Sequence, residues 1–330
     1  MRAPGDVRAS IVAALLMLGS VPAAAEVRFE AAAGVTALRG DATYAIGVAF
    51  STPEGGGLLN DPVSELAFPL DATLATLAAS AEAPLTRGTL VVSGEFSRTV
   101  TDASGTLVDR DWTSLEQPGL VTIFSEADVA LEASIVDLRA RWRFLELDGP
   151  AFGVTREGRG AWAAVGAGYL WEHFTFAGSN VRQRSADPAL TGTRAGPVLD
   201  YEALYRIPYA ELAAGVGFGS PSGAAVALEA RLGASPWAQA DDVDDHLLRA
   251  KRAEGSCTGT ALLAGVRARL DAGRFFLLGS LTRVAIDTEG TQVQERYADT
   301  TEGPAGPIGT IEQTITSAQT RWDLAAGIRF

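Results

Sequence analysis

The sequence predicts an all-β fold, a ten-stranded antiparallel transmembrane β-barrel with long extracellular loops and short periplasmic turns. The first observation is that apolar and polar residues alternate through most of the chain after Glu26, a period of two that is typical of β-strands. The second is that these segments are much longer than the usual strand of about 5–6 residues. The third is that the connections between them alternate between short and long, as in outer-membrane barrels.

About ten strands are predicted, near residues 26–40, 64–83, 88–101, 129–146, 159–179, 198–218, 223–240, 257–271, 275–288 and 319–330. In the fourth, apolar residues fall on odd positions from Val129 to Ile135 and, after a phase shift, on even positions from Leu138 to Phe144. The apolar face of each strand is expected to meet lipid and the charged face to line a polar lumen. The Ala-rich part of the second segment is compatible with a helix by composition, but its neighbours favour a strand.

The connections complete the pattern. Short ones carry turn residues, at Pro84–Arg87, Ser220–Ser222 and Asp271–Gly273, although Leu147–Gly158 is longer than the scheme predicts. The long ones are polar and rich in Gly and Pro, near 41–63, 102–128, 180–197, 241–256 and 289–318. Aromatic residues near strand ends are expected to form interfacial girdles; they are Tyr169, Trp171, Phe174, Phe176, Tyr205 and Tyr209. A soluble β-sandwich is the alternative, but it does not need such long strands.

Composition restricts the function. The formal charge of −13 argues against nucleic acid as a partner and is compatible with cationic peptides. The single cysteine, Cys257, excludes an internal disulfide and a cysteine-based zinc cluster. With only two histidines, far apart in the chain, no metal site is predicted either.

The first residues have the order of a secretory signal. Arg2 and Arg8 precede an apolar run at 11–18, and small residues follow at Val21–Ala25. We therefore expect residues 1–25 to be a signal peptide and residues 26–330 to form the barrel. The apolar run is too short to cross a bilayer as a helix.

One acidic stretch, Asp241–His246, holds one of the two histidines. In an extended chain Asp242, Asp244 and His246 share one face. A carboxylate beside an imidazole fixes its tautomer and stabilises its protonated form, which suits a general base. A solvated acidic loop is the alternative reading of such a run. The run lacks the spacing and the central glycine of a calcium loop.

A second acidic pair, Asp109 and Asp111, has the same i, i+2 spacing. The turn before it ends near Arg87 and the turn before Asp244 ends near Ser222, each 22 residues earlier. At about 3.3 Å per residue and a tilt near 45°, both pairs would stand roughly 45–50 Å above the periplasmic turns, beyond a hydrophobic band of about 25 Å. Their strands are four apart of ten, so the pairs are expected on nearly opposite walls of an extracellular mouth.

Several short motifs, in order and at matching spacing, resemble the omptin family of ten-stranded outer-membrane proteases. They are Val108–Trp112, Gln117–Gly119, Ala167–Tyr169, Arg206–Tyr209, Asp242–His246 and the terminal strand that ends in Phe330. The resemblance implies that the four residues Asp109, Asp111, Asp244 and His246 hold the attacking water, without a covalent enzyme intermediate. Asp244 would orient His246, which accepts the proton of the water, while Asp109 and Asp111 position and polarise it.

The resemblance also implies the substrate, because the family cleaves beside basic residues. Asp242 falls on the acidic position that contacts the basic residue after the scissile bond, and Glu54 is the candidate for the basic residue before it. Ser125 falls where the family has a serine once suspected as the nucleophile, and we expect it not to be one, since the spacing gives no evidence for the geometry that serine catalysis needs.

The sequence departs from the family pattern in two places. Ile123 and Phe124 replace acidic residues that follow the aspartate pair. His173 and Leu204 stand where the family uses arginines to hold lipopolysaccharide. The resemblance therefore does not by itself predict that this chain depends on that activating lipid. Two alternatives to the protease follow: a non-enzymatic barrel for adhesion or surface structure, and a small porin. A ten-stranded lumen that carries many charged side chains is expected to be filled by them, against a porin.

Overall fold

The structure is a computed structural model that describes residues 27–52, 55–58, 62–114, 116–117, 119–147, 158–219 and 224–330. Its elements are β1 (Arg28–Thr52), β2 (Gly55–Leu58), β3 (Ser64–Pro69), β4 (Ala72–Pro84), β5 (Thr89–Thr99), β6 (Ala103–Asp111), β7 (Ile123–Leu147), β8 (Gly158–Ser185), the 3₁₀ turn η1 (Pro188–Leu190), β9 (Gly192–Gly219), β10 (Ala224–His246), β11 (Lys251–Ala272), β12 (Phe275–Arg296) and β13 (Gly306–Arg329). The predicted signal peptide, residues 1–25, lies outside the described residues.

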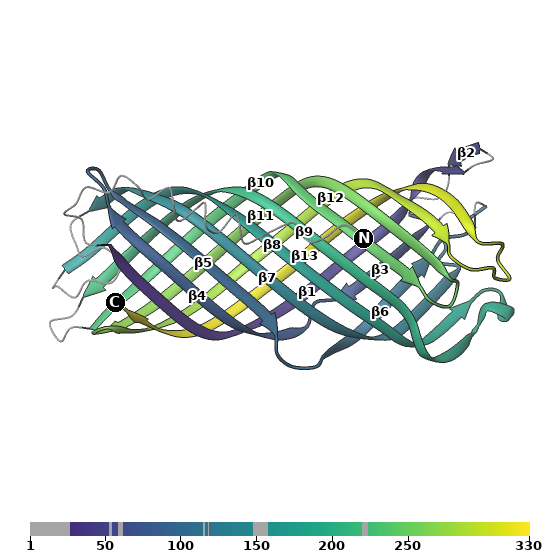
Figure 1. Cartoon of the computed structure of the whole chain (residues 1–330), viewed down its shortest axis with the longest axis horizontal. Coiled ribbons are helices and arrows are strands. Elements are labelled where there is room, and N and C mark those ends of the chain that lie inside the picture. Colours follow the sequence, from purple (N-terminus) through teal and green to yellow (C-terminus); the bar gives the residue numbers. More distant parts are fainter. Residues whose placement is uncertain are drawn as a thin grey trace.

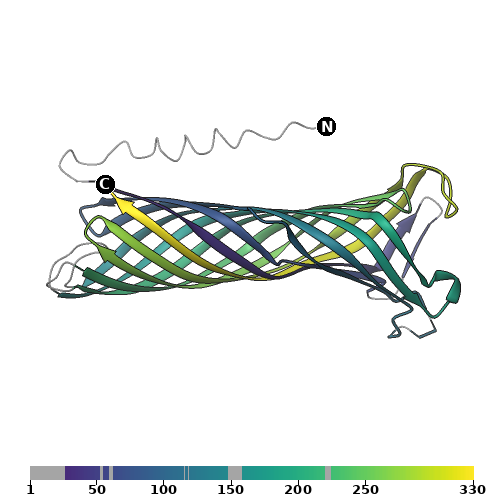
Figure 2. The same cartoon turned by 90° about the horizontal axis from the view of Figure 1, so that it is seen from below.

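The strands close into a single antiparallel barrel. From β6 to β13 each strand pairs with the next strand in the chain, β4 pairs with β5, and β1 pairs with β13, which closes the ring (Figures 1 and 2). Two walls are broken: β4 and β5 form their lower parts, and β3 and β6 their upper parts. At either level the ring therefore has ten positions, eight unbroken strands (β1 and β7 to β13) and two halves. The predicted ten-stranded antiparallel barrel is confirmed.

At one end the described turns are tight. Leu85 and Gly88 close the turn between β4 and β5 through a 2.9 Å backbone hydrogen bond, and Gly88 has a φ of 77° that favours glycine. The Ala-rich segment is strand, β4, as expected from its neighbours.

At the other end the predicted strand boundaries are wrong, because the strands run further than the alternation suggests. β10 extends to His246 and β11 begins at Lys251, so the predicted loop 241–256 shrinks to four residues. The segment 41–63 is likewise strand in large part. The cause is pairing: each extension hydrogen-bonds to neighbours of equal length, which provides the backbone partners that a loop would take from water. The acidic stretches thus lie on strands.

The lumen changes character along the axis. In β7, Ile135, Asp137 and Arg139 all point inward, with 3%, 5% and 5% of their surface exposed, whereas Leu138 and Trp142 are 40% and 43% exposed. The alternation is continuous, so the predicted phase shift marks a change of surroundings. Toward Ile123 water covers the outer face of β7 and apolar side chains turn inward. Toward Leu147 the outer face is apolar and charged side chains turn inward. The expectation that the apolar face of residues 129–135 meets lipid is wrong.

The lower lumen is filled by ion pairs. Arg141 of β7 binds Glu211 of β9 and also Glu229 of β10, the latter at 2.7 Å, and a cavity of only about 10 Å³ remains beside Glu229 and Arg321. This network leaves no room for the aqueous channel of a porin.

An aromatic layer in the upper lumen separates this network from the far end. The ring of Tyr201 stacks on Tyr44 and Phe68, with centroids 5.4 Å and 4.2 Å apart, and Phe68 contacts Phe176 at 4.8 Å. The expected aromatic girdle is therefore wrong for Phe174, Phe176, Tyr205 and Tyr209, which are buried inside the barrel. Only Tyr169 and Trp171 of that set face outward.

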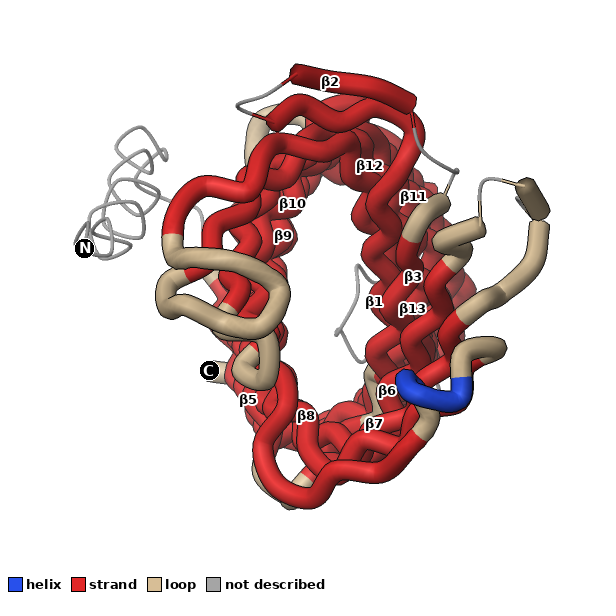
Figure 3. The backbone as a smooth tube through the Cα atoms, turned by 90° about the vertical axis from the view of Figure 1, so that its right-hand side faces the viewer, coloured by secondary structure: helices blue, strands red, loops and turns tan. Residues whose placement is uncertain are grey.

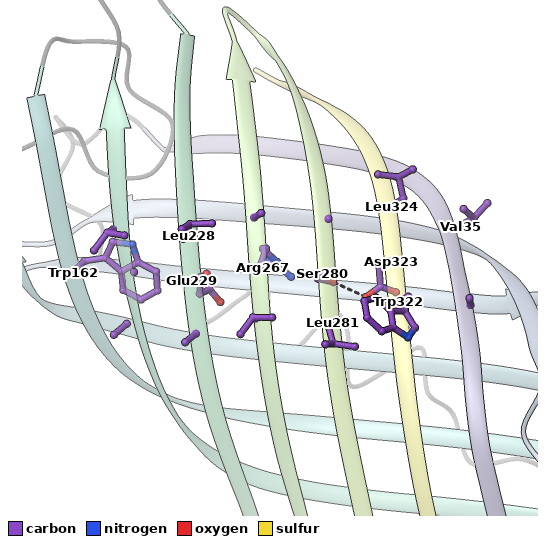
Figure 4. A pocket seen from close by; sticks show the side chains of 18 of the residues that line it. Val35, Trp162, Leu228, Glu229, Arg267, Ser280, Leu281, Trp322, Asp323 and Leu324 are labelled. Atoms are coloured by element: carbon purple, nitrogen blue, oxygen red, sulfur yellow. Dashed lines mark hydrogen bonds between the residues drawn. The ribbon is translucent and has the colours of Figure 1, made fainter.

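The outer face carries a band of exposed apolar side chains around the lower part of the barrel, which we call the apolar band; it includes Leu77, Leu212, Leu228, Leu232, Leu262 and Leu324. A hollow of about 960 Å³ lies at this band, and Figure 4 shows side chains that line it, among them Val35, Trp322 and Leu324. On β10 the band ends at Trp237, and Gln239, Asp241 and Asp245 follow on the outer face. Within the described residues no helix has the length and apolar character to span a membrane.

Candidate active site

The Asp–His pair lies at the end of β10, beyond the apolar band. Asp244 and His246 are two positions apart and point into the lumen, and Asp244 Oδ2 is 2.9 Å from His246 Nε2. Asp244 is 1% exposed, whereas the imidazole of His246 stays partly open to solvent. The carboxylate thus holds the ring from below while the other ring nitrogen can reach a water.

The aspartate pair lies on β6, between β3 and β7. Asp109 is paired with Leu66 of β3 and with Ser125 of β7, and Asp111 is paired with Ser64 and Ile123. Ser64 Oγ donates to Asp109 Oδ1 at 3.5 Å. Both carboxylates are half-buried and face the lumen at the open end of the barrel.

The two pairs lie at the same level and act on each other. β6 and β10 are separated by β7, β8 and β9, so they stand on nearly opposite walls of the ring, which Figure 3 shows end-on as a narrow oval. The charge of Asp244 acts on Asp109, and the charge of His246 acts on Asp111. The structure therefore brings together the four residues that the sequence selected.

The protonation states of the pairs differ. Burial, together with the charges of Asp111 and Asp244, raises the pKa of Asp109 to about 8, and burial also raises the pKa of Asp111. Burial alone would raise the pKa of Asp244 too, but the charge and hydrogen bond of His246 and the hydroxyl of Tyr44 outweigh it and lower that pKa. At neutral pH Asp244 is ionised, and the aspartate pair retains a proton.

Asp242 lies one alternation below Asp244 and is 3% exposed. Burial raises its pKa to about 7; the hydrogen bond from Gln313 opposes this shift, and the charge of Asp244 adds to it. Gln313 Nε2 donates to Asp242 Oδ2 at 2.7 Å, while Oδ1 has no hydrogen-bond partner among the described residues. A buried carboxylate oxygen in this state can accept a hydrogen bond from a cationic side chain.

The other residues named from the sequence lie around this site. The Ser125 hydroxyl donates to Gln183 Oε1 at 3.2 Å, so the described geometry gives it no base. Ile123 and Phe124 are paired with Asp111 and Arg110 of the neighbouring strand. Glu54 lies outside the described residues.

His173 and Leu204 face outward and are paired with each other across β8 and β9. His173 Nε2 is 2.7 Å from Glu202 Oε1, so this histidine belongs to the outer wall and not to the lumen site.

The sequence analysis missed Tyr44, Gln313 and the two cations Arg249 and Lys251. Tyr44 and Gln313 lie in segments that were assigned to loops, although their inward positions continue the alternation of β1 and β13. Lys251 is paired with His246 and is nearly buried, and with Arg249 it opposes the negative charge of the aspartate pair. In the part of the chain that the structure describes, no group of three His, Cys, Asp or Glu side chains is arranged to hold a metal ion.

Fold and site together define an outer-membrane β-barrel with an acid–histidine cluster at its open end. A family model, described as the Omptin family, matches residues 84–330, and the chain belongs to this family. The crystal structure of outer membrane protease OmpT from Escherichia coli is similar, with a TM-score of 0.71 at 16% identity over 92% of this chain and 97% of OmpT. Membership of this family, together with the β-barrel, indicates a bacterial outer-membrane protein.

Other barrels are less similar. The translocator domain of the autotransporter NalP from Neisseria meningitidis matches with a TM-score of 0.32 at 9% identity, over 98% of this chain and 95% of that domain. No curated protein matches the sequence.

Proposed function

We propose that this chain is an outer-membrane endopeptidase that hydrolyses peptide bonds next to basic residues, with its site facing the outside of the cell. The observation that carries the proposal is the meeting of two polar pairs from opposite walls: Asp244 at 2.9 Å from His246, and Asp109 and Asp111 within reach of their charges. Membership of the Omptin family and the OmpT-like fold support a protease.

The reaction follows from the protonation states. A water between the pairs gives a proton to His246 as its oxygen bonds to the scissile carbonyl carbon, and the ionised Asp244 stabilises the imidazolium. The aspartate pair, which keeps a proton at neutral pH because the pKa of Asp109 is raised to about 8, donates a hydrogen bond toward the developing oxyanion. His246 then passes its proton to the leaving amine as the C–N bond breaks, so that no bond to the enzyme forms.

The preference for basic residues rests on Asp242. Its carboxylate is buried one alternation below Asp244, beside Gly255 of β11, and the formal charge of the chain is −13. Both features favour a cationic substrate. Glu54 remains our prediction for the second basic residue.

The test is cleavage of a fluorogenic dibasic peptide by the protein in outer-membrane lipid, with and without lipopolysaccharide. The parent should cleave beside a basic residue, and His246→Ala and Asp244→Asn should lower kcat by about 10²–10⁴-fold, the usual contribution of general acid–base groups. Ser125→Ala should retain activity. Equal cleavage by all variants would refute the assigned roles. No hydrolysis by the parent, even with lipopolysaccharide, would favour the non-enzymatic surface barrel.

A further inference from the structure

Two buried carboxylates of β10 are held from the facing wall of the barrel. The Tyr44 hydroxyl of β1 donates to Asp244 Oδ2, and Gln313 Nε2 of β13 donates to Asp242 Oδ2 at 2.7 Å. These donors cross the lumen, since β11 and β12 lie between β10 and the β1–β13 wall (Figure 3). They also belong together, because Gln313 is paired with Ile46, the next inward position of β1 after Tyr44.

Each carboxylate is held by one oxygen and leaves the other without a partner. Oδ2 of Asp244 receives Tyr44 and contacts His246, and Oδ2 of Asp242 receives Gln313, whereas Oδ1 of either residue is buried with no hydrogen-bond partner among the described residues. Loss of Gln313 would remove this hold on Asp242, and loss of the Tyr44 hydroxyl would leave Asp244 with its contact to His246.

A glycine on β11 lies beside the second contact. A Cβ atom added at Gly255 would lie 2.0 Å from Gln313 Oε1 and 2.1 Å from Asp242 Oδ1. A larger residue at this position would displace the end of one or both of these side chains. The close approach of these two side chains therefore depends on the neighbouring strand β11 as well as on the donor.

We propose that Tyr44 and Gln313 are positioning residues with separate tasks, Tyr44 for the catalytic step and Gln313 for recognition of the basic residue. Tyr44 fixes the Asp244 carboxylate so that it holds the imidazole of His246 toward the water. Gln313 fixes Asp242 so that its free Oδ1 meets the cationic side chain of the substrate. This inference rests on the proposed protease function and adds one residue that affects the rate and another that affects the selectivity.

Packing is the competing explanation for Tyr44, because its ring stacks on Tyr201 and Phe68. Tyr44→Phe keeps the ring and removes only the hydroxyl, so it separates the two explanations. Tyr205→Phe is a matched control. Tyr205 is also a fully buried tyrosine of the aromatic layer, but its hydroxyl has no hydrogen-bond partner among the described residues.

The experiment compares Tyr44→Phe, Gln313→Met and Tyr205→Phe in the full chain, refolded in lipid with lipopolysaccharide. The substrates are a dibasic peptide and versions with citrulline, the neutral analogue of arginine, at each basic position in turn. Tyr44→Phe should lower kcat by about 10- to 100-fold with little change in KM, since an ordering hydrogen bond to a charged group is lost. As the pH falls, this variant should lose activity at a higher pH than the parent does, because the Tyr44 hydroxyl helps to lower the pKa of Asp244.

Gln313→Met should raise KM by about tenfold for the dibasic peptide and for the peptide with citrulline before the scissile bond. It should leave kcat, and the peptide with citrulline after the scissile bond, nearly unchanged. Gly255→Ala should resemble Gln313→Met, and Tyr205→Phe should resemble the parent. The inference is overturned if Tyr44→Phe and Gln313→Met both behave like Tyr205→Phe, or if each changes kcat and KM to the same extent.

A second readout does not depend on activity. The chain has two histidines, so ¹⁵N imidazole signals of His246 can be assigned by comparison with His173→Gln. Tyr44→Phe should change the tautomer signals of His246, and Gln313→Met should not. If the parent cleaves no peptide but this pattern is seen, the proposed function fails and the hold on Asp244 stands; unchanged signals in Tyr44→Phe overturn the inference for Tyr44 in either case.

Discussion

Asp242 makes substrate recognition dependent on pH in a range that is easily measured. Burial raises its pKa to about 7, and only the ionised carboxylate forms a charge-assisted contact with a lysine or arginine side chain. A group with a pKa of about 7 is roughly one tenth ionised near pH 6 and roughly nine tenths ionised near pH 8. Affinity for a basic residue should therefore rise about tenfold across this interval.

The assay measures kcat/KM for a dibasic peptide and for its citrulline analogues as a function of pH. The catalytic groups titrate equally with all of these peptides, so Asp242 is isolated by the ratio of kcat/KM for the dibasic peptide to kcat/KM for the analogue with citrulline after the scissile bond. This ratio should rise about tenfold between about pH 6 and pH 8, since the ionised fraction rises by that amount. In Asp242→Asn, which cannot ionise, the ratio should be low and flat. A flat ratio in the parent, or the same slope in Asp242→Asn, would refute the reasoning.

Three further predictions concern the catalytic pair, the ionic lumen and the apolar band. Because the pKa of Asp109 is raised to about 8 and the proposed reaction needs its proton, kcat should fall as the pH rises through about 8, and Asp109→Asn should remove that alkaline limb; a limb unchanged in the variant would contradict this role. Arg141→Met removes a paired cation from the buried Glu211 and Glu229, of which Glu211 keeps Arg231 at 3.3 Å, and should lower the free energy of unfolding by about 3–5 kcal/mol in urea titrations in lipid, whereas the exposed Arg182→Met should cost under about 1 kcal/mol. Leu212→Arg, on the outer face of the apolar band, should cost about 2–4 kcal/mol in the same titration, and equal stability of this variant and the parent would mean that the band does not face lipid.

The sequence was sufficient for the barrel and for the placement of the four polar residues, because both follow from a period of two. The roles of these residues come from the family resemblance and stay a prediction. Asp242, Asp244 and His246 share one face in any extended chain, whether it is called strand or loop. Equal distances from the short turns placed Asp109 and Asp244 at one level, and the structure has them close enough to act on each other.

The ends of the strands could not be predicted, because the pattern loses contrast where the surroundings of the outer face change from apolar to aqueous. Above the apolar band both faces of β1 and β13 mix polar and apolar residues, so the segments with Tyr44 and Gln313 were assigned to loops. Aromatic residues were misplaced for a related reason, since Phe174 or Tyr205 suits a membrane interface and a lumen equally well. The contact of Tyr44 with Asp244 joins residues 200 positions apart, and only the closed ring brings them together.

The central claim is that one water is held between the Asp109–Asp111 pair and the Asp244–His246 pair. A high-resolution crystal structure of the protein in a lipid environment tests it most directly. The account predicts a single ordered water within about 2.6–3.2 Å of a ring nitrogen of His246 and of a carboxylate oxygen of Asp109 or Asp111. Density that shows these side chains at different levels of the barrel, or turned away from a common water, would contradict it.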